Sequence, residues 1–160
     1  EGGQILIRGV MHELVREDGR GKPRIVRDDT PKLIVPAVEG SFEIRVRRYL
    51  KELAERSLVA RVEHHAGVLR LPFGRVRVKD TSTRWGSCAP DGDLAFSWRL
   101  IGAPPFVLDY VAAHEVAHLK QANHSSRFWK LVDELYGDPS PARDWLRDNA
   151  ALLFAIGAQA

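Results

Sequence analysis

Two histidines four residues apart, with a glutamate directly after the first, are the residues of this sequence best suited to chemistry. They lie in the segment His114-Glu115-Val116-Ala117-His118. Side chains four residues apart on an α-helix occupy the same face, so both imidazoles can reach one ion. Zn²⁺ binds imidazole nitrogen at about 2.0–2.1 Å in a tetrahedral shell. The H-E-x-x-H pattern therefore predicts a zinc site on a helix.

Glu115 has the position expected of a general base. A catalytic zinc site uses three protein ligands and leaves the fourth position for water. On a helix, Glu115 is rotated by about 100° from its neighbour His114. It can therefore reach the zinc-bound water without competing for the metal, and we expect it to activate that water for attack.

The third ligand is predicted to be His124, six residues after His118 and beyond an expected break in the helix. The spacing H-E-x-x-H-x5-H matches that of metzincins, but Gln121 stands where they have glycine. We therefore expect Asn123, which tolerates positive φ, to make the turn. The competing third ligands are carboxylates of the next helix, Asp133 and Glu134.

The surroundings of the two histidines favour a metal site over a chance motif. In a helix predicted over residues 105–120, Val107 and Val111 share one face with His114 and His118. Imidazoles buried on an apolar face need polar partners, since an unpaired polar group there costs free energy. A bound ion would satisfy both rings.

The remaining pattern predicts the elements that position this helix. Residues 4–10 and 24–27 favour strands, and residues 32–35 an extended run between prolines. Further helices are expected at about residues 42–58, 126–137 and 141–156. Strands are expected at residues 75–79, 84–88 and 93–100, the last two as a hairpin around Ala89-Pro90-Asp91-Gly92.

Some residues near these elements have two interpretations. The strand segment Arg84-Trp85-Gly86-Ser87 is a candidate for pairing with the substrate backbone; equally, Trp85 can be core and Gly86 a bulge. His64 and His65 are expected in solvent. Cys88 is expected to be a small apolar residue. The candidates for oxyanion stabilisation are Tyr136 and Arg127, with neither favoured by spacing. The aromatic residues expected in the core are Trp98, Phe128 and Trp145.

Composition bounds the class of protein. The chain has 160 residues, of which 44% are apolar and 28% charged, and this suits one globular domain. Its net charge of +3 permits an anionic partner without requiring one. The single cysteine excludes an intramolecular disulfide and favours a reducing, cytoplasmic setting. No apolar run approaches the roughly 20 residues that span a bilayer, so we expect no membrane partner.

Several motifs between Thr83 and Trp129 occur in a characteristic order. They are Thr83-Arg84-Trp85-Gly86-Ser87-Cys88, Leu94-Ala95-Phe96-Ser97-Trp98-Arg99-Leu100, Ala103-Pro104-Pro105, Val107-Leu108-Asp109-Tyr110-Val111, His114–His118-Leu119, Asn123-His124-Ser125 and Phe128-Trp129. With them the sequence resembles the YgjP-like metallopeptidase family, relatives of the SprT-like proteases. The first 80 residues match less sharply.

The resemblance implies an α+β, zincin-like metallopeptidase domain. Its parts would be a backing helix, a short, mainly antiparallel sheet, the active-site helix and C-terminal helices. It implies one Zn²⁺ held by His114, His118 and His124, with Glu115 as catalytic base. We expect a single domain over residues 1–160, with residues 1–40 as an N-terminal extension and residues 41–160 as the catalytic core.

Three functions are compatible with these features. The favoured hypothesis is a zinc metallopeptidase that acts on a peptide or protein substrate. The second hypothesis is a protease that acts on DNA-bound proteins, and it is motivated by the basic residues within 45–56. Glutamates interleave with these basic residues, which favours a solvated helix face instead. Nucleic acid is therefore not the favoured partner. The third is a non-catalytic zinc-stabilised binding module, which would have no use for Glu115. The oligomeric state is not predicted.

Overall fold

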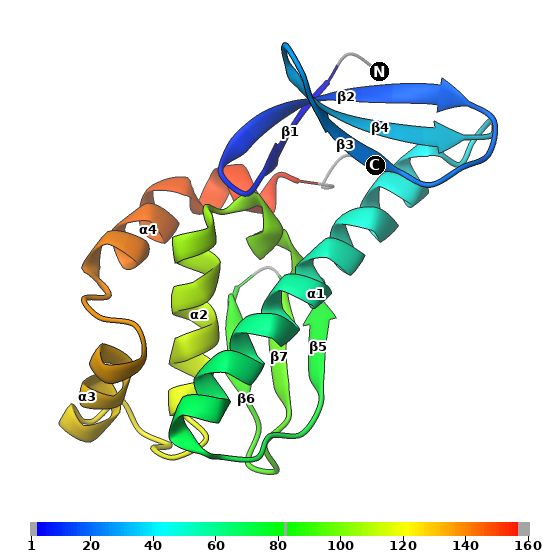
Figure 1. The fold of residues 1–160 in the computed structure, drawn as a ribbon. Helices are drawn as coiled ribbons and strands as arrows, with labels where there is room; N and C mark the ends of the chain where they lie inside the picture. Colours follow the sequence, from blue (N-terminus) through cyan, green and yellow to red (C-terminus); the bar gives the residue numbers. More distant parts are fainter. Residues whose placement is uncertain (1–2, 82, 157–160) are drawn as a thin grey trace.

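The computed structural model describes residues 3–81 and 83–156. Its N-terminal strands are β1 (Gln4–Ile7), β2 (Val10–Asp18), β3 (Arg24–Arg27) and β4 (Pro31–Ala37). Next come α1 (Phe42–Leu69), β5 (Val76–Lys79), β6 (Gly86–Cys88), β7 (Leu94–Ser97) and the 3₁₀ helix η1 (Trp98–Gly102). The last elements are α2 (Pro105–Ala117), α3 (Ser126–Leu135) and α4 (Ser140–Phe154). The predicted α+β class is confirmed, and Figure 1 shows the arrangement.

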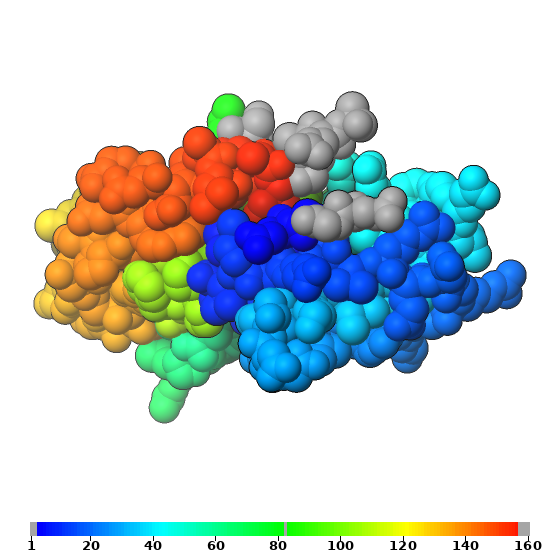
Figure 2. Space-filling model, turned by 90° about the horizontal axis from the view of Figure 1, so that it is seen from above, coloured from blue at the N-terminus to red at the C-terminus, as the bar shows by residue number. Residues whose placement is uncertain are grey.

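The N-terminal strands form a sheet of order β1-β2-β4-β3 at the end of the molecule where α1 and α2 begin (Figure 1). The prediction of one strand over residues 4–10 is wrong. Arg8 and Gly9 have φ of 51° and 81° and make a two-residue turn into β2. Their N–H groups donate to the carbonyls of Ile101 and Gly102, which ties the turn to η1. Seen from above, the blue strands cover this end beside the orange-red α4 (Figure 2).

Helix α1 is longer than predicted, because it continues from Leu58 to Leu69. Its buried stripe extends past Leu58 through Val62, His65 and Ala66 at helical spacing. The prediction that His65 lies in solvent is wrong, because His65 is only 1% exposed. The neighbouring His64 is exposed as expected. The helix ends where Arg70 adopts a left-handed conformation, with φ of 56°.

The second sheet has the order β5-β7-β6 and lies beside α1 and α2. The predicted hairpin is confirmed, since β6 and β7 pair antiparallel around residues 89–93. Strand β5 pairs parallel to β7, as β2 does to β4. Antiparallel ladders still outnumber parallel ones among the described strands. In this order β6 is an edge strand, which leaves one side of its backbone open.

Strand β7 ends at Ser97, so the prediction of a strand to Leu100 is wrong. All residues of η1 are buried, so the alternation of buried and exposed residues expected of a half-exposed strand does not continue past Ser97. The Ser97 hydroxyl accepts a hydrogen bond from the Arg99 N–H and starts the helical turn. Arg99 is only 7% exposed. Its burial is tolerated because its guanidinium forms an ion pair with Asp80 and donates a hydrogen bond to the Ile156 carbonyl.

Helix α2 is the central element of the core. It contacts α1, η1, β6, α3 and α4, and nine of its thirteen residues are buried. A helix that is apolar on most sides needs such enclosure. Within residues 3–81 and 83–156, the structure contains no helix with the length and apolar character needed to cross a membrane.

Candidate metal centre and active site

Three histidine side chains converge where α2 meets the loop before α3. The Nε2 atom of His124 lies 3.1 Å from that of His118 and 3.4 Å from that of His114. The possible ligand atoms of all three lie within 4.8 Å of one another. Two nitrogens bound to one tetrahedral zinc ion are about 3.3 Å apart, given bonds of about 2.0–2.1 Å. The three residues therefore fit one zinc ion.

The turn that returns His124 to α2 is made by a tightened helix end. The N–H groups of His118, Leu119 and Lys120 each donate to the carbonyl three residues earlier. The helix consequently ends at Ala117 rather than near Lys120. The expectation that Asn123 supplies a positive φ is wrong, because the non-glycine residues with positive φ in the described chain are Arg8 and Arg70.

The alternative third ligands do not join the histidines. Asp133 and Glu134 are exposed on α3, and the group of possible ligands contains neither. Ser125 caps α3 by accepting a hydrogen bond from the Phe128 N–H, so the helix starts directly after His124. His124, rather than a carboxylate of α3, therefore joins His114 and His118.

Hydrogen bonds to the outer ring nitrogens orient two of the imidazoles. Nδ1 of His118 lies 3.0 Å from the Gln121 carbonyl oxygen, which can only accept, so this nitrogen carries the proton. Nε2 of His118 is then left with a lone pair for a metal. Nδ1 of His114 lies 3.3 Å from the Tyr110 hydroxyl. Such partners fix the tautomer and the ring orientation of metal ligands.

An aromatic wall supports the histidines from α3. Phe128 is fully buried, as predicted, and its ring stacks on His118 with centroids 4.4 Å apart. It also meets the His114 ring edge-on at 4.9 Å. The Trp129 ring lies 6.1 Å from that of His124. These rings therefore pack against all three imidazoles from the side of α3.

Glu115 lies beside the histidines and is 5% exposed. Its Oε2 atom is 4.0 Å from Nε2 of His114. The space it occupies exists because residue 86 is glycine: a Cβ there would lie 2.9 Å from Glu115 Cγ and 3.0 Å from Oε2. Gly86 pairs one-to-one with Phe96, so it is not a bulge. The edge strand and the motif helix are thus in direct contact at Gly86 and Glu115.

Burial sets the protonation of this centre. It raises the pKa of Glu115 to about 7, against the opposing positive charge of Arg84. Burial, together with the charges of the neighbouring His118, His124 and Arg143, lowers the pKa of His114 to about 4. Burial is also the main cause of the lowered pKa of His118. Neutral imidazole is the form that binds a metal, so both shifts favour ligation near neutral pH.

The edge strand exposes alternate backbone groups beside Glu115. The Trp85 carbonyl accepts from the Ser97 N–H at 2.9 Å, and the Ala89 N–H donates to the Asp93 carbonyl at 2.8 Å. Because antiparallel bonding alternates along a strand, the backbone groups of Gly86 and Cys88 face the open edge. Burial raises the pKa of the Cys88 thiol.

A cavity of about 310 Å³ opens beside Glu115. It is lined by Arg84, Trp85, Gly86, Tyr110, Val111, His114, Glu115, Arg143 and Leu146. Ser87 of the predicted substrate segment does not line it. Trp85 is half-buried and stacks on Phe154 of α4, with ring centroids 4.3 Å apart.

Sequence reasoning missed three residues of this cavity. Tyr110 lies one helical turn before His114, and this spacing was a usable signal. Arg143 and Leu146 come from α4, and no local pattern links them to the motif. Conversely, Arg127 and Tyr136 do not line the cavity, and the Tyr136 hydroxyl donates to the Phe106 carbonyl instead.

A polar cluster between α1 and α2 accounts for the buried His65. Oδ1 of Asp109 lies 2.7 Å from Nε2 of His65 and 2.8 Å from Nε of Arg61. Burial acts to raise the pKa of Asp109, but the hydrogen bonds from His65 and Arg61 outweigh it and leave this pKa lowered. The cluster joins the motif helix α2 to the backing helix α1.

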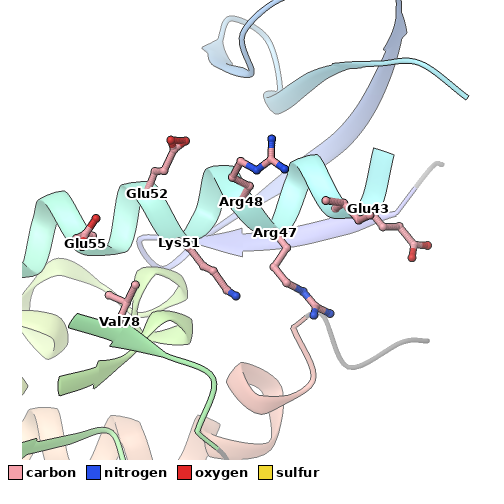
Figure 3. A pocket seen from close by; sticks show the side chains of 8 residues that line it. Glu43, Arg47, Arg48, Lys51, Glu52, Glu55 and Val78 are labelled. Atoms are coloured by element: carbon pink, nitrogen blue, oxygen red, sulfur yellow. The ribbon is translucent and has the colours of Figure 1, made fainter. Parts of the chain in front are cut away.

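A larger hollow of about 640 Å³ lies along the first half of α1, against Val78 of β5 (Figure 3). Its charged lining residues are three bases and three acids: Arg47, Arg48, Lys51, Glu43, Glu52 and Glu55. It shares no lining residue with the histidine centre. The mixed charge matches the predicted solvated face, and nucleic acid as a possible but not favoured partner stays a prediction.

A helix bearing H-E-x-x-H, with a third histidine after it and an edge strand beside it, defines a zincin-like metallopeptidase fold. The protein family described as "YgjP-like, metallopeptidase domain" matches residues 1–149, so the chain belongs to this family. The resemblance seen in the sequence is thereby confirmed.

A solved structure supports the same fold. This chain is similar to the crystal structure of the metallopeptidase zymogen of Pyrococcus abyssi abylysin, with a TM-score of 0.51 and 22% sequence identity. The match covers 59% of this chain and 94% of the abylysin chain. No curated protein matches significantly.

Proposed function

We propose that this chain is a zinc-dependent peptidase in which His114, His118 and His124 hold one Zn²⁺ and Glu115 is the general base. The observation that carries the proposal is the convergence of three Nε2 atoms, with a Glu115 carboxylate oxygen 4.0 Å from one of them. Bound zinc would polarise the scissile carbonyl and lower the pKa of water from 15.7 to about 7.

The protein groups supply the rest of the chemistry. The Glu115 carboxylate accepts a proton from the attacking water and passes it to the leaving amine. A base works best with a pKa near ambient pH, and burial moves Glu115 in that direction. The outward backbone groups of Gly86 and Cys88 are available to pair with an extended substrate, which would give binding that tolerates many sequences.

Substitution of Glu115 tests this proposal. We expect Glu115→Gln to keep zinc and lose hydrolysis of unfolded casein, because the amide cannot accept the proton. Glu134→Gln is the matched control, since Glu134 is exposed on α3. Full activity in Glu115→Gln with normal zinc content would contradict the mechanism. Zinc binding without hydrolysis by the unaltered chain would favour the non-catalytic module.

The ligand set has its own test. We expect His124→Ala to lower zinc occupancy sharply, because only two histidine ligands remain. His64→Ala changes an exposed histidine of α1 and should leave zinc content unchanged. Zinc content is measured by mass spectrometry after dialysis. Unaltered stoichiometry in His124→Ala would point to a different third ligand.

A further inference from the structure

Two arginines from distant parts of the chain line the cavity beside Glu115. Arg84 comes directly before β6, and Arg143 comes from the first turns of α4. They share this cavity with His114 and Glu115, the residues assigned to metal and base. A substrate bound for hydrolysis at Glu115 would have both guanidinium groups within its binding cavity.

Neither arginine is paired with a carboxylate. In the part of the chain that the structure describes, no salt bridge includes Arg84 or Arg143. Arg147, one turn further along α4, is different: it lies 3.2 Å from Asp144 and 3.1 Å from Asp148. The two cavity arginines thus keep their hydrogen-bond donors available, while a neighbour on the same helix does not.

The position of Arg143 is held by an aromatic ring of the metal centre. Its guanidinium carbon lies 5.2 Å from the centroid of Trp129, within the range of a cation–π contact. The Trp129 ring is itself 5.8 Å from the His114 ring. The Arg143 guanidinium therefore lies against a ring that contacts the histidine cluster.

The charge balance of the cavity calls for an anion. Among its described lining residues, Glu115 carries the single carboxylate. Three imidazole ligands are neutral and do not offset the double charge of a zinc ion. Arg84 and Arg143, both exposed residues, add two further positive charges beside this carboxylate.

We infer that Arg84 and Arg143 form a subsite for a substrate carboxylate next to the scissile bond. Guanidinium groups bind carboxylates through short, paired hydrogen bonds. The apolar walls formed by Trp85, Val111 and Leu146 suit the methylene stem that carries such a group. The carboxylate is that of an aspartate or glutamate side chain, or that of the peptide's own C-terminus. This inference rests on the proposed peptidase function.

Matched peptides test the inference in the zinc-loaded chain. Quenched fluorescent peptides would carry Glu or Gln at the positions flanking the scissile bond, each with a free or an amidated C-terminus. We expect kcat/KM to be about 10–100-fold higher with the carboxylate, the range for a charged hydrogen bond. Preference for Glu in amidated peptides identifies the side chain; preference for the free terminus identifies the α-carboxylate.

The variants assign the preference to the two arginines. Arg143→Gln and Arg84→Gln should each lower the carboxylate preference, the ratio of kcat/KM for the carboxylate peptide to that for the uncharged peptide, at least fivefold. Arg143→Lys should restore part of it. Arg147→Gln removes the same charge from the same helix and should keep the full preference. A preference that survives in both Arg84→Gln and Arg143→Gln overturns the subsite.

A binding measurement separates this inference from the peptidase proposal. Metal-free chain is titrated with Ac-Ala-Glu-Ala-NH₂, Ac-Ala-Gln-Ala-NH₂ and Ac-Ala-Ala-Ala with a free C-terminus, by tryptophan fluorescence. Tighter binding of a carboxylate peptide, reduced in Arg143→Gln, supports the subsite even without hydrolysis. Equal affinities overturn it. Equal loss of kcat on charged and uncharged peptides in Arg143→Gln also overturns it, because that pattern places Arg143 at the developing oxyanion.

Discussion

Gly86→Ala is the substitution that tests the packing of the catalytic base most directly. The new Cβ would lie 2.9 Å from Glu115 Cγ, 3.0 Å from its Oε2 and 3.1 Å from Phe96 Cδ1. Carbon atoms in favourable contact are about 3.5–4.0 Å apart, so Glu115 must move by about 0.6–1 Å. Phe96 is 1% exposed and cannot yield easily. The clash therefore falls on the carboxylate.

A displacement of this size has a known order of effect on catalysis. A misplacement of about 1 Å can lower a rate by about 100-fold, and we expect kcat/KM of Gly86→Ala to fall by about that factor. Zinc should stay bound, because the methyl group points at Glu115 rather than at the three histidines. Gly86 does not have a positive φ, so alanine brings no backbone strain of its own.

The assay compares kcat/KM, zinc content and thermal unfolding in the same preparations. Gly67→Ala is the matched control, since it adds the same methyl group to α1 with no neighbouring atom within 4 Å. It should keep full activity. The reasoning is refuted if Gly86→Ala keeps normal kcat/KM, or if its activity falls only in proportion to lost zinc or lost folded protein.

Two further substitutions probe the support of the motif helix. Tyr110→Phe removes the hydroxyl at Nδ1 of His114, and zinc affinity should fall by about 10–100-fold in a chelator competition; Tyr136→Phe should not alter it. Asp109→Asn should destabilise the metal-free chain by about 1–2 kcal/mol in urea at pH 7. The lowered pKa of Asp109 makes its ionised form stabilising above the unfolded pKa of about 4. The difference from the unaltered chain should therefore vanish as pH falls through the folded pKa; a constant difference would contradict this.

The centre was predictable where the signal is local in sequence. His114, Glu115 and His118 share one short helix, and His124 follows within a few residues, so spacing alone brings them close. The same reasoning applied further would have found two more features. Tyr110 has helical spacing to His114, and His65 continues the stripe of Leu58 and Val62 on α1.

The contacts that spacing could not predict join distant segments. No periodicity indicates that Gly86 meets Glu115, because the alternation of a strand does not identify the helix that packs on it. The parallel pairing of β5 with β7 and of β2 with β4 is non-local in the same way. Arg143 reaches the cavity only because α4 packs against α2 and η1. Chain topology, rather than pattern, decides these positions.

The end of α2 explains why a cation suits this place. The last carbonyls of a helix carry a partial negative charge of about half an elementary charge, which favours cations nearby. The neutral imidazoles of His114 and His118 lie in that last turn, and the tightened bonds after Ala117 bring His124 to the same end. Asp109 anchors α2 to α1 through Arg61 and His65. The helix can therefore hold the three histidines at its end while Glu115 meets the edge strand.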